Sequence, residues 1–196
     1  MDGRPRRRQA SAMDTHAPLP HAADGLTICS VTRLDEPALR AGLEALLEDA
    51  VASGASVGFH APLDPTLNRA FWDEIAADLA GGHLTLLVAR DAEGAVAGCV
   101  QLVPSPKQNA RHRAEVRKLL VHSAHRRRGI ARRLMEDLCA SAREQGRIVL
   151  QLDTLAGDVG EPFYRSTGWI QAGVLPDHTL EADGRYHDTV LFHRRL

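Results

Sequence analysis

Five arginines surround a single glycine in residues 126–133, RRRGIARR, just before apolar residues with helical spacing. The first turn of a helix has unpaired N–H groups and the positive end of the helix dipole, so it attracts phosphate. Gly129 lets a phosphate approach the backbone closely, and the arginines add positive charge. This segment suits a pyrophosphate cradle. Taken alone, it equally suits the solvated face of an amphipathic helix.

Arg126 to Ala131 also matches the R/Q-x-x-G-x-G/A signature of the GNAT superfamily of N-acetyltransferases, with Ala131 at the second small position. The strand-like segment Leu119 to Val121 precedes it at the distance usual in that family. Residues 161–169, EPFYRSTGW, resemble the family's second motif, a helix carrying a tyrosine followed by Gly and an aromatic residue. The resemblance covers roughly residues 26–196. A nucleotide site of the Walker type is excluded because G-x-x-x-x-G-K-[ST] does not occur.

The resemblance implies a cleft that binds acetyl-CoA as cosubstrate. In this family a bulged fourth strand splays from the fifth and leaves a V-shaped slot for the pantetheine arm. A backbone N–H near Leu119 would polarise the thioester carbonyl. The cofactor-binding residues implied in this sequence are Leu119, Leu120, Val121, Arg126, Arg127, Arg128, Gly129, Ile130, Ala131 and Arg132.

The resemblance also makes Tyr164 a candidate catalytic residue, because a phenol can protonate the thiolate that leaves when an amine attacks the thioester. An amine is protonated at neutral pH, so a carboxylate must accept a proton before the attack. Glu115 and Asp153 are the two candidates for this base. The alternatives stay open: a packed core tyrosine, surface carboxylates, or a turn cap at Asp153.

A narrower resemblance is to the tabtoxin-resistance type of GNAT enzyme, which acetylates a β-lactam toxin. It rests on residues 55–59, 71–72, 115–118, 153 and 163–164. It predicts a small-molecule primary amine as substrate, with Ser56, Phe59 and Trp72 as candidate contacts. The competing hypotheses are a protein or peptide N-acetyltransferase and a catalytically silent acyl-CoA-binding module.

The elements that must position these residues are read from the apolar spacing. A strand over residues 26–32 is followed by a helix from an N-cap at Asp35 to about residue 52. A loop rich in Gly, Ser and Pro then leads to a second helix, whose apolar stripe is Leu67, Phe71, Ile75 and Leu79 and which ends at residues 81–82.

Three strands follow over residues 83–90, 96–103 and 114–121, the first two joined by a turn at residues 91–94. A third helix ends near residue 146, and a fifth strand over residues 148–152 pairs in parallel through a right-handed crossover. A short helix over residues 162–166 and strands over residues 169–174 and 186–192 complete the chain. We therefore expect an α/β (α+β) GNAT fold, a mostly antiparallel sheet of about six to seven strands with helices on both faces.

Composition narrows the remaining possibilities. The chain has 196 residues and a formal net charge of -1, which predicts no attraction to nucleic acid or to an anionic membrane. Residues 1–25 carry arginines but few large apolar side chains and are expected to be a disordered tail before one domain, 26–196. The three cysteines are expected to be free thiols in a cytoplasmic protein, and no histidine spacing suggests a metal site. The domain is expected to act as a monomer or homodimer.

Overall fold

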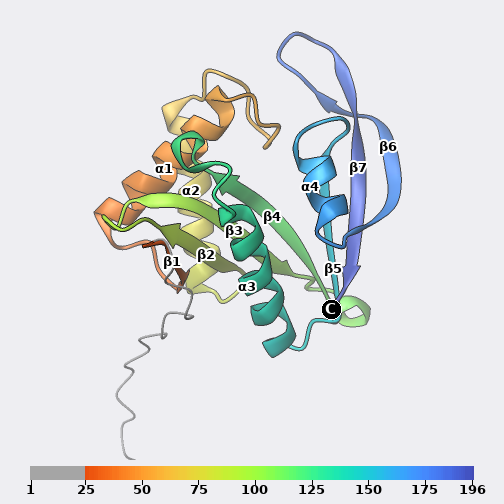
Figure 1. Ribbon diagram of the computed structural model, residues 1–196, viewed down its shortest axis with the longest axis horizontal. Coiled ribbons are helices and arrows are strands. Elements are labelled where there is room, and N and C mark those ends of the chain that lie inside the picture. Colours follow the sequence, from red (N-terminus) through yellow and green to blue (C-terminus); the bar gives the residue numbers. More distant parts are fainter. Residues whose placement is uncertain (1–24) are drawn as a thin grey trace, which may run out of the picture.

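A seven-stranded sheet organises the chain in the computed structural model, which describes residues 25–196 (Figure 1). Its strand order is β1-β2-β3-β4-β5-β7-β6, antiparallel at every step except the parallel pair of β4 and β5. The strands are β1 Thr27–Val31, β2 Thr85–Arg90, β3 Val96–Pro104, β4 Arg113–Val121, β5 Val149–Leu155, β6 Ile170–Leu180 and β7 Tyr186–Arg195. The expected fold class and parallel crossover are confirmed. The tail expected over residues 1–25 lies outside the described residues except for Gly25.

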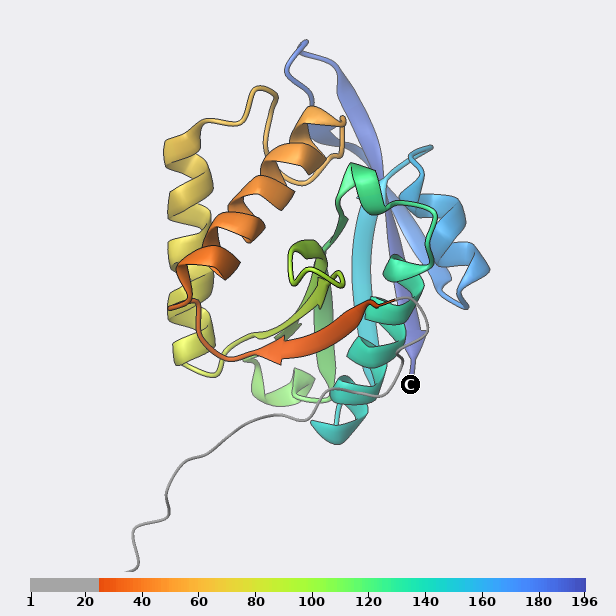
Figure 2. The same ribbon diagram turned by 60° about the vertical axis from the view of Figure 1, so that its left-hand side comes forward.

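Helices cover both faces of this sheet (Figures 1 and 2). On one face, α1 Pro37–Ala52 and α2 Pro65–Ala80 pack through leucines and Trp72 against alternate residues of β2 and β3. On the other face, α3 Ile130–Glu144 buries its apolar stripe against the remaining residues of the same strands. The short helix α4 Gly160–Ser166 follows β5 on the α3 side. The buried residues of β2 thus alternate between the two cores, whereas in β3 and β4 the alternation shifts at the irregular positions of the sheet.

Two details of the helices differ from expectation. Asp35 does not cap α1: Glu36 occupies the N-cap without a side-chain hydrogen bond, while Asp35 pairs with Arg33 at 2.5 Å. Pro37 at the first helical position has no N–H and a fixed φ, which sets the start of the helix without a side-chain cap. In α2 the predicted stripe is shifted, because Leu67 is 55% exposed and Asn68 and Trp72 face the core instead.

Close packing between β3 and β4 depends on Gly98. A Cβ built at Gly98 would lie 2.7 Å from the backbone carbonyl oxygen of Leu120 and 3.3 Å from Leu134 Cδ1. The nearest atom belongs to the backbone of β4, which is paired with β3 at Leu120. Moving it would disturb this pairing. Gly98 therefore lets β4 lie close to β3 just beyond the point where β4 is irregular.

We predict that Gly98→Ala destabilises the fold by about 1–3 kcal/mol, because the methyl group would force β3 and β4 apart. The matched control is Gly173→Ala on the edge strand β6, where a Cβ would meet nothing within 4 Å and φ is not positive. Urea unfolding of both variants measures the difference. Equal stabilities for the two alanine variants would contradict the close approach at Gly98.

Candidate functional site

The strands β4 and β5 share only three paired positions before they part. Residues 113–115 pair with residues 149–151, and no register partner on β5 follows Glu115. Beyond that point Lys118 and Leu119 together oppose the single residue Val100 of β3, which is a β-bulge, and Lys118 has a φ of +50°. A bulge bends the strand that carries it. The predicted splay of the fourth strand from the fifth is therefore confirmed.

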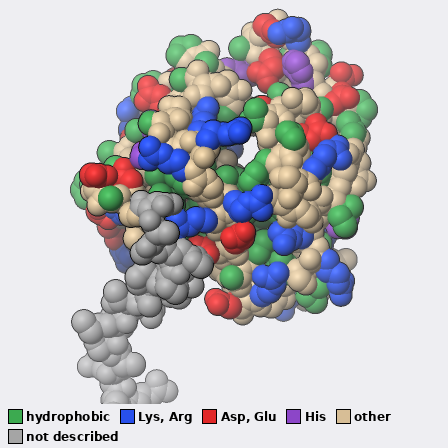
Figure 3. All heavy atoms as spheres, viewed as in Figure 1, with side chains coloured by type: hydrophobic (Ala, Val, Ile, Leu, Met, Phe, Trp, Pro, Cys, Tyr) green, Lys and Arg blue, Asp and Glu red, His purple; other side chains and the backbone are tan. Residues whose placement is uncertain are grey.

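The opening between the parted strands is a cleft of about 1360 Å³. Figure 3 shows the surface hollowed between the two halves of the molecule, with lysine and arginine side chains beside the hollow. Leu119, Leu120 and Val121 line the cleft from the β4 side, and Thr154 and Tyr164 line it from the β5 and α4 side. Beyond Glu115, β4 has no partner on its β5 side, which leaves its backbone available to a ligand lying in the cleft.

The arginine-rich loop closes one end of this cleft. Gly129 is the N-cap of α3 with a φ of +77°, and Arg127 also has a positive φ of +66°. Backbone N–H groups at such a left-handed turn and at a helix start form an anion-binding hollow. The residues of the loop that line the cleft are Arg126, Arg127, Gly129, Ile130, Ala131 and Arg132. Arg128 is exposed and does not line the cleft, so of the implied cofactor residues it is the one that the structure leaves outside.

Asp49 of α1 anchors the turn that leads into this loop. The turn is the short 3₁₀ helix η2 Ser123–His125; the Asp49 carboxylate accepts hydrogen bonds from Ser123 N at 2.8 Å and Ser123 Oγ at 2.6 Å. Partial burial alone would raise the pKa of Asp49, but the Ser123 hydrogen bonds and the charges of His122 and Arg126 lower it below its ordinary value. Sequence reasoning missed Asp49, because it lies 74 residues from Ser123 and within an ordinary helical pattern.

The predicted proton-transfer residues meet at the same cleft. Glu115 and Asp153 both line it, and strand alternation places both on the α1 and α2 side of the sheet. Glu115 accepts a 2.6 Å hydrogen bond from Arg117, whereas no hydrogen bond to the Asp153 side chain occurs among residues 25–196. Tyr164 is only 8% exposed; burial, followed by the charges of Asp153 and Asp158, raises its pKa well above the ordinary value for a phenol.

The loop between α1 and α2, residues 53–64, forms a strap along the other end of the cleft. Ser56 and Phe59 line the cleft from the strap, as expected of substrate contacts. Trp72 does not: its side chain is fully buried in the core of α1, α2 and the sheet, edge-on to Phe71 at 5.0 Å. We therefore correct Trp72 to a packing residue. The narrower family resemblance had implied a substrate contact at Trp72, but this side chain belongs to the core beneath the strap.

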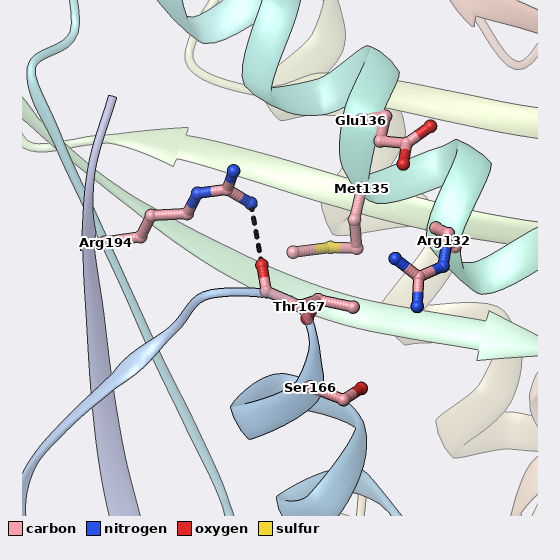
Figure 4. A pocket seen from close by; sticks show the side chains of 6 residues that line it. All are labelled: Arg132, Met135, Glu136, Ser166, Thr167 and Arg194. Atoms are coloured by element: carbon pink, nitrogen blue, oxygen red, sulfur yellow. Dashed lines mark hydrogen bonds between the residues drawn. The ribbon is translucent and has the colours of Figure 1, made fainter.

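A second, smaller hollow of about 280 Å³ lies between α3, α4 and β7 (Figure 4). Arg132, Met135 and Glu136 come from α3, and Ser166 and Thr167 come from the end of α4. Arg194 of β7 donates a 3.2 Å hydrogen bond to the carbonyl oxygen of Thr167. Arg132 lines this hollow as well as the cleft, so the two are neighbours on the surface.

Within the described residues, no three His, Cys, Asp or Glu side chains gather as metal ligands would. His122 and His125 instead lie 3.9 Å from Asp49 and 3.6 Å from Asp91. Of the helices in residues 25–196, none is long and apolar enough to cross a bilayer. Cys29, Cys99 and Cys139 are free thiols, as expected.

The family described as Acetyltransferase (GNAT) matches residues 43–169. A ribosomal-protein-alanine N-acetyltransferase from Brucella melitensis is similar in structure, with a TM-score of 0.70 and 28% identity, over 86% of this chain and 99% of that one.

Two further solved structures share the fold at lower identity. The protein yncA from Salmonella typhimurium, solved with its cofactor acetyl-CoA, has a TM-score of 0.70 and 23% identity, over 88% of this chain and 95% of that one. An N-acetyltransferase from Staphylococcus aureus has a TM-score of 0.71 and 17% identity, over 87% and 98% of the two chains.

We predict that Asp49→Asn destabilises the protein by about 1–3 kcal/mol at pH 7, because an amide replaces the charged acceptor for Ser123. A carboxyl whose folded-state pKa is lowered stabilises the fold above its unfolded pKa of about 3.9 and loses that effect as pH falls through the folded value. The stability difference between wild type and variant should therefore vanish in acid.

Unfolding measured from pH 7 down to pH 2, well below the ordinary pKa of an aspartate, tests this dependence. The control is Asp73→Asn on α2, whose carboxylate is 72% exposed in its ion pair with Arg40 and should contribute little. A pH-independent deficit at Asp49 would contradict the anchoring role.

Proposed function

Because the chain belongs to the GNAT family of acetyltransferases, which use acetyl-CoA as cosubstrate, we propose that it transfers the acetyl group to a primary amine of a small molecule. One observation carries this proposal: the cleft between the parted strands has a cationic loop at one end and two carboxylates with a proton-donating phenol at the other. A polyanionic cosubstrate and an amine acceptor fit these two ends.

The cofactor half of the proposal rests on the loop and the free edge of β4. Arg126, Arg127 and the first N–H groups of α3 would hold the pyrophosphate around Gly129. The amide-bearing pantetheine arm would pair with β4 from Leu119 to Val121, where the strand has lost its partner on β5. The nucleotide end would then lie beside Arg132 and the smaller hollow.

Asp153 is the stronger of the two candidate bases. The Glu115 carboxylate is already occupied by Arg117, and taking a proton would weaken that ion pair. Asp153 lies at the end of β5 that faces the cleft, and its charge acts on both Tyr164 and Lys118, so it is close to the reacting centre. We propose that Asp153 accepts the proton of the incoming ammonium, with Glu115 and Arg117 shaping the field around it.

Tyr164 is proposed as the donor to the leaving group. Its raised pKa favours the protonated phenol, which is the form that can donate a proton. When the amine nitrogen forms its bond to the carbonyl carbon, the carbon–sulfur bond breaks and negative charge develops on sulfur. The hydroxyl proton then stabilises that sulfur, and the proton released by the amine restores the phenol. The rings of Trp169 and Phe192, 6.0 and 5.8 Å away, fix the position of the tyrosine.

The strap favours a small acceptor. It follows the cleft and reaches the strand beyond it, since His60 Nε2 lies 3.0 Å from the carbonyl oxygen of Leu180 on β6. A peptide substrate laid across the sheet would have to displace the contact between His60 and Leu180. A toxin or antibiotic amine, as in tabtoxin-resistance enzymes, is one such small acceptor.

The second candidate is acetylation of a protein N-terminus, which is favoured by 28% identity to a ribosomal-protein-alanine N-acetyltransferase. Thiol release from acetyl-CoA with a panel of acceptors separates the two. Amino acids, amino-acid-derived antibiotics and simple diamines represent small amines, and a peptide with an N-terminal alanine represents proteins. Turnover with the peptide but with none of the small amines would overturn the small-molecule proposal.

We predict that Tyr164→Phe lowers kcat about 10²-fold on the best amine of that panel, the scale of general acid catalysis. The ring and its packing are retained, so acetyl-CoA affinity and melting temperature should change little. Tyr186→Phe on the exposed β7 hairpin, where the tyrosine is 63% exposed, is the matched control. Full kcat in Tyr164→Phe would show that the hydroxyl takes no part in the reaction.

A further inference from the structure

Lys118 sits at the bulge of β4 with its side chain turned toward the strap. Its Nζ donates a 2.5 Å hydrogen bond to the backbone carbonyl oxygen of Val57. The same ammonium lies over the rings of Phe59 and Phe71, at 5.6 and 5.4 Å from their centroids. One cation thus joins the sheet, the strap and α2.

The Lys118 side chain is partly buried among these partners. Burial lowers the pKa of Lys118, and the nearby charge of Arg117 lowers it further, while Asp153 acts in the opposite direction. An ammonium removed from water must find other favourable contacts. Here the Val57 carbonyl oxygen accepts its hydrogen bond, and two aromatic rings face it. Removing the ammonium would therefore leave the Val57 carbonyl without its partner.

The backbone at Lys118 is also unusual. The φ of Lys118 is +50°, which is rare for a residue with a Cβ. Glycine adopts such an angle without steric strain. The bulge would accept glycine readily, so the bulge alone does not account for a lysine here. The Lys118 side chain makes contacts with Val57, Phe59 and Phe71 that a glycine could not make.

The strap held by Lys118 carries the acceptor side of the cleft. Ser56 and Phe59 flank the anchored Val57 and line the cleft, and His60 continues to the Leu180 carbonyl oxygen of β6. In Figure 1 this loop runs above the open end of β4 toward β6 and β7. Freeing Val57 would therefore move the wall against which an acceptor binds.

We infer that Lys118 is a positioning residue that fixes the strap of residues 53–64 as the wall of the acceptor pocket and so determines affinity for the amine. The expected effect on amine affinity rests on the proposed acetyl transfer. The anchoring of residues 53–64 by Lys118 does not depend on it. The cofactor loop lies at the other end of the cleft, and among residues 25–196 no direct hydrogen bond or ion pair joins residues 126–132 to the strap. Loss of Lys118 should therefore separate amine binding from cofactor binding.

Hydrogen exchange of the full-length protein without any amine tests the structural part. Lys118→Met and Lys118→Gly should each raise exchange in residues 53–64 about tenfold or more, the scale of a lost charge-assisted hydrogen bond. Lys118→Arg, which keeps a cation able to meet the carbonyl and both rings, should restore much of the protection. Peptides from α3 serve as the internal reference for folding. Unchanged exchange of the strap in both the Met and Gly variants would overturn the inference, whether or not an amine substrate is found.

Steady-state kinetics with the best amine of the acceptor panel tests the functional part. Lys118→Met should raise KM for the amine about tenfold or more and leave KM for acetyl-CoA unchanged. Lys107→Met, at the only other lysine of the chain and on an exposed position, is the control and should change neither value. Equal increases in both KM values, or no increase in either, would contradict a role confined to the acceptor pocket.

Discussion

Strand β4 cannot continue beside β5 beyond Glu115, because the extra residue at Lys118 and Leu119 bends it away. The rest of the site follows from this loss of pairing. The freed edge of β4 offers backbone hydrogen-bonding groups, and the space between the strands reaches both faces of the sheet. This space would admit a cosubstrate from the α3 side and an acceptor from the α1 and α2 side, as the proposed acetyl transfer requires.

Charged side chains of different kinds lie at the two ends of the cleft. Arginines and the start of α3 gather at the cofactor end, held in place by the bonds between Asp49 and Ser123. Carboxylates gather where the strands part, within electrostatic reach of Tyr164. Of these carboxylates, Glu115 is held in an ion pair by Arg117. Asp153 lies beyond the three residues of β5 that pair with β4, and within residues 25–196 its carboxylate accepts no hydrogen bond.

Much of this arrangement could be predicted from residues that act locally. Gly129 and the arginines indicated the loop at the start of α3, the apolar spacing indicated the helices, and the family resemblance implied the bulged fourth strand. Contacts between distant segments could not be predicted. Asp49 gives no signal toward Ser123, and Lys118 gives none toward Val57, 61 residues away. Trp72 was misassigned because its aromatic side chain suits a pocket and a core equally, and only the packing of α2 decides between them.

The central claim is that the loop around Gly129 holds the pyrophosphate of acetyl-CoA, and calorimetric titration of acetyl-CoA into Gly129→Asp tests it most directly. The matched control is Gly146→Asp at the other end of α3, where φ is +71° against +77° at Gly129 and a Cβ likewise meets nothing within 4 Å. Backbone strain is therefore similar in the two variants, and only the first places a carboxylate at the anion loop. The account predicts that Gly129→Asp weakens binding at least about tenfold, through repulsion and obstruction of the phosphates, while Gly146→Asp binds like wild type. Equal affinity in both variants would contradict it.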